Sequence, residues 1–264
     1  MLTKRLIACL DVINGRVTKG VKFQDNIDVD AAEVMAEKIY QAGIDEMIFF
    51  DITASAEKRR TDIETIKRVA KRVFIPFTVG GGIRNLDDMY EVLKAGAEKI
   101  SVDSMAVRNP QIINDGAKAF GSQCIVLSTQ VQRVPKTQQI PSGFEVFIDG
   151  ARVATGMDAL EWVQRGQELG AGEICLNSID CDGTHNGYDL ELMRIAEEAL
   201  SIPLIASGGA GKPEHLKDVF TQTDAQAAII SSMLYSPRME RNYSVEELKS
   251  YLLKHGVPMR PMRV

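Results

Sequence analysis

Short apolar runs alternate with helical hydrophobic patterns along the whole chain. The segments between the runs repeat apolar residues at helical spacing, as at Ile63, Ile66, Val69 and Val73. This alternation is typical of a parallel sheet whose strands are connected by helices. The predicted strands are Leu6–Asp11, Glu46–Asp51, Phe74–Val79, Lys99–Asp103, Gln123–Thr129, Glu173–Asn177, Pro203–Ala206 and Ala227–Ser231.

The number of strands and the length of the chain agree with one architecture. Eight strands in 264 residues match the ~250 residues of an eight-stranded (β/α)8 TIM barrel, so a single domain over residues 1–264 is expected. Helix starts support this reading: they are predicted at Asn109-Pro110, at Asp189, at Lys212-Pro213 and at a capping box from Ser244 to Glu247.

Two segments do not fit the simple alternation. The stretch from Asn14 to Asp28 is polar, contains Lys19 and Lys22, and is predicted to be a long loop in the position of an active-site lid. The second segment follows the fifth strand, where Asp149-Gly150 separates Phe144–Ile148 from Ala151–Val153 and predicts an inserted β-hairpin. Nothing in the sequence assigns a role to this hairpin.

Two apolar runs end in glycines before a helical pattern, at Phe77–Arg84 and Leu204–Lys212. Such turns expose backbone N–H groups at a helix start and favour phosphate, although glycine is also needed there for geometry alone. Gly80 and Gly208 lie 128 positions apart, as do the strand ends Asp103 and Ser231. The barrel is therefore expected to consist of two similar halves, each with a phosphate site, and its ligand to be elongated with a phosphate at each end.

Composition narrows the function classes. The net charge of −5 and the absence of a long basic run argue against a nucleic-acid surface. No apolar run is long enough to span a membrane, and the N-terminus enters a strand pattern at once, which leaves no room for a signal peptide. The four cysteines lack a metal-binding spacing, so reduced thiols in a cytoplasmic protein are expected, with neither metal nor cofactor.

Several strand ends carry candidate chemistry. Asp11 should project into the mouth of the barrel, where its carboxylate can act as a general acid or base or simply cap the following loop. Asp51 is better explained by a structural hydrogen bond to its loop. Beyond the sixth strand, Asp182 can face a ligand, and Gly183 exposes the backbone to it. A lone histidine, His185, lies in the same loop and is given no role.

The sequence resembles one family, the cyclase subunit of imidazole glycerol phosphate synthase in histidine biosynthesis. The similarity covers essentially the whole chain. The motifs that carry it are Ile7-Ala-Cys-Leu-Asp-Val12, Gly15-Arg-Val-Thr-Lys-Gly20, Phe50-Asp-Ile-Thr-Ala-Ser55, Phe77-Thr-Val-Gly-Gly-Gly-Ile83, Gly172-Glu-Ile174, Asp182-Gly-Thr184 and Ile205-Ala-Ser-Gly-Gly-Ala-Gly211. The resemblance implies a barrel that takes ammonia from a glutaminase partner and converts a ribulosyl aminoimidazole carboxamide bisphosphate into imidazole glycerol phosphate and an aminoimidazole carboxamide ribotide (AICAR).

The resemblance also implies roles for residues. Asp11 matches the first catalytic acid/base, and Lys19 matches a lysine of the mobile first loop. Positions that bind one phosphate fall on Gly82, Asp103 and Ser104. Positions that bind the other phosphate, with Asp182 beside them, fall on Gly183, Gly209, Ser231 and Ser232. A charged ring that gates ammonia at the N-terminal face of the barrel, where the glutaminase binds, falls on Arg5, Glu46, Lys99 and Glu173.

Two positions depart from the family pattern. The second catalytic aspartate falls on Gln130, whose amide can orient a substrate but cannot exchange a proton at neutral pH. Asp103 stands where asparagine is common, and a carboxylate beside a phosphate is repulsive unless a cation intervenes.

These departures leave alternatives to a working cyclase. One is a cyclase-like ammonia-relay subunit that serves another acceptor, for example in the amidination of surface sugars. The sister isomerase of the pathway and a non-enzymatic scaffold are less favoured, because the former needs no gate and the latter needs no phosphate sites. The retained Asp11, Lys19 and glycine turns favour the cyclase.

Overall fold

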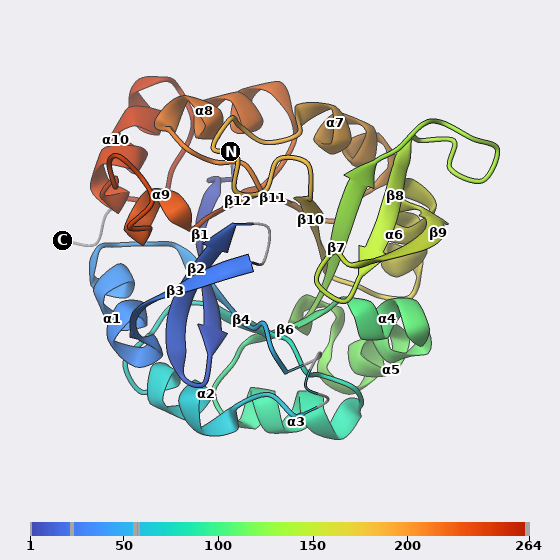
Figure 1. The fold of residues 1–264 in the computed structure, drawn as a ribbon, viewed down its shortest axis with the longest axis horizontal. Helices are drawn as coiled ribbons and strands as arrows, with labels where there is room; N and C mark the ends of the chain where they lie inside the picture. Colours follow the sequence, from blue (N-terminus) through green and yellow to red (C-terminus); the bar gives the residue numbers. More distant parts are fainter. Residues whose placement is uncertain (1, 22–23, 55–56, 58, 262–264) are drawn as a thin grey trace.

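The centre of the molecule is a closed barrel of parallel strands, surrounded by helices (Figure 1). The computed structural model describes residues 2–21, 24–54, 57 and 59–261. Around the barrel the strands follow one another in chain order, and the last strand, Ala227–Ile230, pairs with the first, Arg5–Ile13, to close the ring. The predicted TIM barrel is thus confirmed. Its strands are β1 (Arg5–Ile13), β4 (Glu46–Asp51), β5 (Phe77–Gly80), β6 (Lys99–Val102), β7 (Ile125–Arg133), β10 (Glu173–Ser178), β11 (Leu204–Ser207) and β12 (Ala227–Ile230).

The third predicted strand began too early. β5 begins at Phe77 rather than at Phe74, because Pro76 has no N–H to donate to a neighbouring strand and Phe74 points into solvent, 69% exposed. The fifth predicted strand also began too early. β7 begins at Ile125 rather than at Gln123, because a 3-10 turn over Ser122–Cys124 precedes it.

The predicted helix starts agree with the structure. The side chain of Asp189 caps α7, Pro213 is the first residue of α8, and the capping box of Ser244 and Glu247 is formed at α10. Among the described residues no helix has the length and apolar character needed to cross a bilayer. The helices are α1 (Ala32–Gln41), α2 (Ile63–Ala70), α3 (Leu86–Lys94), α4 (Ser104–Arg108), α5 (Gln111–Phe120), α6 (Ala159–Glu168), α7 (Leu190–Ala199), α8 (Pro213–Gln222), α9 (Ser232–Tyr235) and α10 (Val245–Lys254).

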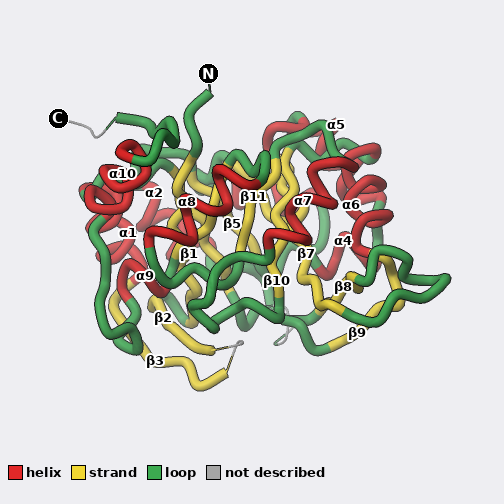
Figure 2. Tube along the Cα trace, turned by 90° about the horizontal axis from the view of Figure 1, so that it is seen from above, coloured by secondary structure: helices red, strands yellow, loops and turns green. Residues whose placement is uncertain are grey.

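Two antiparallel hairpins extend from one end of the barrel, opposite both chain termini (Figure 2). The predicted hairpin is confirmed as β8 (Phe144–Ile148) and β9 (Val153–Asp158). The predicted loop from Asn14 to Asp28 was wrong, because β2 (Arg16–Val21) and β3 (Gln24–Ala31) also form a hairpin. Asn14-Gly15, both with positive φ, is the two-residue turn that joins β1 to β2, a signal that the polar composition obscured. Lys22 lies outside the described residues.

Alternate residues of each barrel strand point into the barrel, which fixes what lies at either end. On β1 the inward residues are Arg5, Ile7, Cys9 and Asp11; Ile7 and Cys9 belong to a small apolar cluster separate from the main core. Since a strand rises about 3.3 Å per residue, Arg5 and Asp11 lie roughly 20 Å apart along the barrel interior. Arg5, one of the predicted ring residues, and Asp11, at the mouth, therefore lie at opposite ends of the barrel interior, with apolar side chains between them.

Candidate active site

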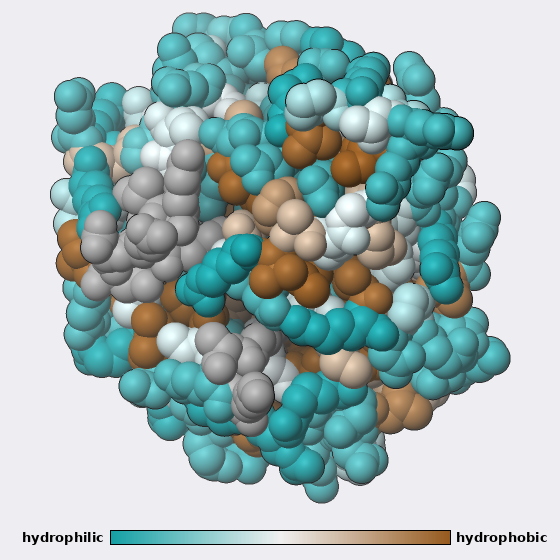
Figure 3. Space-filling view, turned by 45° about the vertical axis from the view of Figure 1, so that its right-hand side comes forward, coloured by the Kyte–Doolittle hydropathy of each residue, from teal (hydrophilic) through white to brown (hydrophobic). Residues whose placement is uncertain are grey.

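A pocket opens at the carboxyl ends of the barrel strands, where the sequence placed the candidate residues. Its lining includes the predicted residues Asp11, Lys19, Gly82, Asp103, Ser104, Gln130, Asp182, Gly183, Gly209, Ser231 and Ser232. On the face shown in Figure 3, hydrophobic side chains gather near the centre and hydrophilic side chains surround them. The structure brings all these residues into one cavity, although they come from strands throughout the chain.

Asp11 and Lys19 form an ion pair in this pocket. The Lys19 Nζ lies 3.0 Å from the Asp11 Oδ2, and the two side chains are 13% and 17% exposed. Antiparallel pairing of β1 with β2 sets this contact, because Asp11 lies opposite Thr18. Burial, the largest single effect, lowers the pKa of Lys19, but the charge of Asp11 together with the smaller effects of Tyr235, Cys9 and Asp182 outweighs it and raises that pKa, so the lysine stays protonated.

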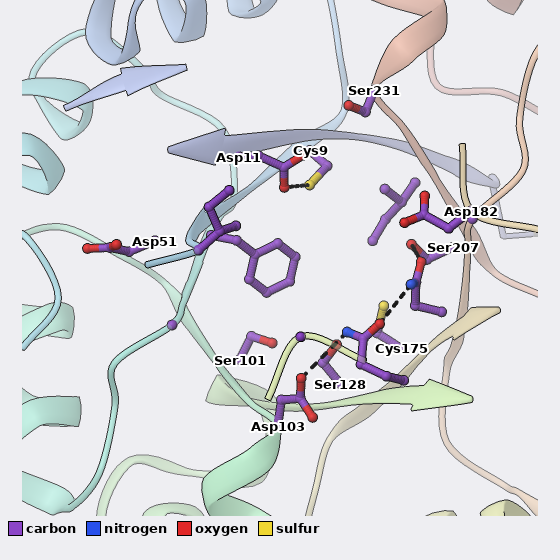
Figure 4. A pocket seen from close by; sticks show the side chains of 18 of the residues that line it. Cys9, Asp11, Asp51, Ser101, Asp103, Ser128, Cys175, Asp182, Ser207 and Ser231 are labelled. Carbon is purple, nitrogen blue, oxygen red and sulfur yellow. Dashed lines mark hydrogen bonds between the residues drawn. The ribbon is translucent and has the colours of Figure 1, made fainter. Parts of the chain in front are cut away.

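Asp11 has a second contact, with Cys9 on the same strand. The Cys9 thiol donates a hydrogen bond of 3.6 Å to the Asp11 Oδ1 (Figure 4). Burial, and next the charge of Asp11, raise the pKa of Cys9 well above its usual value, so the sulfur is a neutral donor. Asp11 is thereby fixed between a cation and a thiol.

A chain of hydrogen bonds crosses the pocket from Ser207 to Asp103 (Figure 4). The Ser207 hydroxyl donates to the Asn177 Oδ1 over 2.8 Å, and the Asn177 Nδ2 donates to the Gln130 Oε1 over 2.8 Å. The Gln130 Nε2 then donates to the Asp103 Oδ2 over 3.5 Å. Both ends of the Gln130 amide are therefore committed. Asn177 and Ser207 were missed by the sequence reasoning, although their inward position on β10 and β11 was available from strand alternation.

The carboxyl of Asp103 lies in an unusual environment. Its Oδ1 is inaccessible to solvent and has no hydrogen-bond partner among the described residues. Burial raises the pKa of Asp103 to about 7; the hydrogen bond from Gln130 opposes this rise, and the charges of Asp149 and Arg108 have smaller effects, the first raising and the second lowering the pKa.

The two glycine turns have matching backbone geometry. Gly81 and Gly82 have φ of +89° and +74°, and Gly208 and Gly209 have φ of +90° and +104°. A Cβ on Gly209 would lie 2.0 Å from the Gly187 carbonyl oxygen, so only glycine fits. The residues before α4 and α9, Asp103 and Ser231, have similar backbone angles, with φ of −135° and −144° and ψ of −105° and −75°. Asp103 and Ser231 are the predicted 128 positions apart. The matched glycines are 127 positions apart, so Gly81 rather than Gly80 corresponds to Gly208 in the structure.

The turn of the β8–β9 hairpin contacts helix α4. The backbone N–H of Asp149 donates to the Ser104 Oγ over 2.9 Å, and Arg108 pairs with the Asp149 carboxylate. Asp149 and Gly150 consequently form part of the pocket lining. The hairpin therefore borders the site, a point that the sequence did not decide.

Three other pocket residues have different surroundings. Asp51 accepts two hydrogen bonds of 2.6 Å from Arg59 in the following loop, as expected of a structural role. Burial raises the pKa of Asp182, and the charge of Lys19 opposes that rise. Burial, then Lys19, lowers the pKa of His185, so this histidine is neutral at pH 7. No cluster suited to a metal ion occurs in the described part of the chain.

The four predicted ring residues contact one another at the opposite end of the barrel. Arg5 pairs with Glu46 over 2.7 Å and with Glu173 over 2.9 Å. Lys99 pairs with the same two carboxylates over 3.3 and 2.9 Å. Each is the first residue of its strand, so the alternating charges close a ring at the N-terminal end.

Comparison with known proteins gives full-length matches. The family model described as "Histidine biosynthesis protein" matches residues 5–240. A protein of Desulfosudis oleivorans called imidazole glycerol phosphate synthase subunit HisF is 54% identical over 98% of this chain and 99% of its own. Proteins of the same name from Desulfatibacillum aliphaticivorans and Syntrophobacter fumaroxidans are each 53% identical over 98% of this chain, covering 98% and 99% of their own lengths.

Proposed function

The chain belongs to the family of imidazole glycerol phosphate synthase cyclase subunits, which act in histidine biosynthesis, and from this we propose how its own pocket works. The substrate is the ribulosyl aminoimidazole carboxamide bisphosphate, and the products are imidazole glycerol phosphate and AICAR. The observation that carries this proposal is the pairing of two matched glycine turns with the Asp11–Lys19 ion pair in one cavity.

The two turns suit the two ends of a bisphosphorylated substrate. We assign one phosphate to Gly82 and Ser104, and the other to Gly183, Gly209, Ser231 and Ser232, because glycine backbone and serine hydroxyls donate to phosphate oxygens. A substrate held at both ends places its central carbons near Asp11. There the Asp11 carboxylate can remove and return protons, while Lys19 stabilises negative charge that develops on oxygen.

Ammonia is proposed to reach this point through the barrel. The ring of Arg5, Glu46, Lys99 and Glu173 forms the entrance, and the interior beyond it is lined by apolar side chains such as Ile7 and Ile48. Uncharged ammonia passes such a column more easily than ammonium, because an apolar column penalises the ion more strongly. The partner that supplies it is a glutaminase subunit, which we place on the N-terminal face.

The proposed function is tested by turnover with ammonium salt. The purified chain should consume the bisphosphate substrate and release AICAR and imidazole glycerol phosphate in equal amounts, and omission of ammonium should abolish both. Product analysis by chromatography measures this directly. No turnover, together with retained ammonia transfer from a glutaminase partner, would favour the ammonia-relay alternative. The observation that favours this alternative is Gln130 at the position of the family's second catalytic aspartate.

The partner surface gives a separate prediction. Phe74 precedes β5 at the N-terminal end of the barrel and is 69% exposed, with its ring against Tyr40. Phe74→Asp should lower glutamine-driven turnover with the glutaminase about tenfold, since exposed aromatic residues contribute strongly to interfaces. Ammonium-driven turnover should not change. Val153→Asp, an exposed site on the hairpin at the mouth, is the matched control and should affect neither rate.

A further inference from the structure

We propose that Asp103 is a catalytic acid of this pocket, and that Ser207, Asn177 and Gln130 are positioning residues that hold its carboxyl in place. The proposal rests on the cyclase function given above and assigns Asp103 a role in proton transfer rather than in phosphate binding.

The first argument is the position of Asp103 opposite Asp11. Asp11 is an inward-facing residue of β1, Asp103 directly follows β6, and both line the cavity (Figure 4). Asp103 precedes α4, whose first residue Ser104 belongs to one proposed phosphate site. A carboxyl at this point faces the substrate from the side opposite to Asp11.

The second argument is the absence of a cation bound to Asp103. Among the described residues that line the pocket, Asp11 is paired with Lys19, Asp51 with Arg59 and Asp149 with Arg108. Asp182 faces the charge of Lys19. Among the described residues, the Asp103 Oδ2 accepts a hydrogen bond from the amide of Gln130, and the other oxygen, Oδ1, is buried without a partner. Because Oδ1 is closed off from the cavity, a ligand meets the carboxyl of Asp103 at Oδ2, the oxygen that points into the pocket (Figure 4).

The electrostatic surroundings favour that proton. Asp149, from the β8–β9 turn, places negative charge near Asp103, and the guanidinium of Arg108 on α4 is already bonded to Asp149. From β10, the Cys175 thiol is neutral because burial raises its pKa to about 12. With a pKa of about 7, Asp103 can exist in both protonation states near neutral pH.

The hydrogen-bond chain explains why the amide is at position 130. Gln130 accepts from Asn177 and donates to Asp103, so its direction is fixed by Ser207 and Asn177. The amide keeps Oδ2 directed into the pocket, where the carboxyl can exchange a proton with a ligand. Because the head groups of Gln130 and Asp103 are 3.5 Å apart, a carboxyl from either strand end could act on the same region of the pocket.

The step assigned to Asp103 is the loss of water after ammonia has added to the ketone of the substrate. A proton of the Asp103 carboxyl moves through Oδ2 to the hydroxyl of the carbinolamine, the C–O bond breaks, and water leaves as the nitrogen lone pair forms the C=N bond. The resulting iminium then loses one N–H proton to the Asp103 carboxylate. The acid is regenerated, and the sum is ketone and ammonia giving imine and water.

The test compares the native chain with Asp103→Asn in the ammonium-driven assay. Asparagine keeps the size and polarity but cannot exchange a proton, so kcat should fall about 100-fold while KM changes little. In the native chain kcat/KM should decrease above about pH 7, as the required acid ionises. Asp103→Asn should lack that decrease. Asp87→Asn, the same change at an exposed position on α3, is the control.

A reciprocal variant separates catalysis from structure. The double variant Asp103→Asn, Gln130→Asp supplies a carboxyl from the neighbouring strand in place of the one removed. Its kcat should be at least tenfold higher than that of Asp103→Asn, and kcat/KM should decrease at a different pH than in the native chain. If Asp103→Asn leaves kcat and the pH profile unchanged, or raises KM alone, the proposal is overturned while the cyclase function stands. If the native chain itself fails to turn over, the proposed function fails first.

Discussion

Asp11→Asn is expected to lower ammonium-driven cyclisation by about 10³–10⁴-fold, at the upper end of what a general acid/base contributes. Asparagine preserves the shape of the side chain and its place at the end of β1, so the loss should appear in kcat. The charge change also acts on Lys19, which is buried and keeps a raised pKa through its contact with Asp11. Without that partner the pKa of Lys19 should fall.

Steady-state rates and the pH dependence of Lys19 acetylation measure the two effects. Asp87→Asn serves as the control for the substitution itself, and thermal unfolding checks that the fold is intact. A variant that folds normally and retains more than a tenth of native kcat would show that Asp11 is a binding residue. Loss in both Asp11→Asn and Asp103→Asn, each with native KM, would indicate two carboxyls acting on one substrate.

The largest expected loss of stability lies away from the pocket. Lys249 of α10 and Asp45, just before β4, form an ion pair of 2.6 Å in which both side chains are only 2% exposed. Asp45 also accepts the Leu6 N–H of β1, and Lys249 also donates to the Gly43 carbonyl. Lys249→Met leaves a buried carboxylate without a cation and should lower the free energy of unfolding by about 3–5 kcal/mol.

Urea unfolding followed by circular dichroism gives that free energy. Lys249→Met combined with Asp45→Asn removes both charges and should recover much of the loss, because the cost arises from the uncompensated ion. The outer pair of Lys67 and Glu64 provides a comparison, since Lys67→Met at this exposed site should change the free energy of unfolding little. Equal losses at the two sites would contradict this account.

The barrel could be predicted from sequence because its signals are local. Each strand is a short apolar run, and helix starts such as Asp189 and Ser244 are fixed by residues three positions apart. The first hairpin was missed although Asn14-Gly15 marks it, because polar residues dominate the stretch. Local chemistry therefore determined most of the elements.

The surroundings of the catalytic side chains could not be predicted in the same way. In the sequence, Asp103 and Gln130 are two unrelated departures from the family pattern. Only the structure, with β6 and β7 side by side, shows that their side chains form a hydrogen bond. The ion pair of Asp45 with Lys249 likewise joins residues about 200 positions apart. Such contacts depend on barrel register and on the docking of the last helix, neither of which leaves a signal in nearby residues.

The pairing of β12 with β1 has a consequence for synthesis in the cell. The first strand pairs with the last: Arg5 to Ala8 lie opposite Ala227 to Ile230. One edge of β1 therefore has no partner until β12 has been made. While the ribosome extends the chain, β1 keeps an unpaired edge, and the apolar column stays open along that side. Barrel closure therefore requires that β12 has already been synthesised, which makes it a late step in folding.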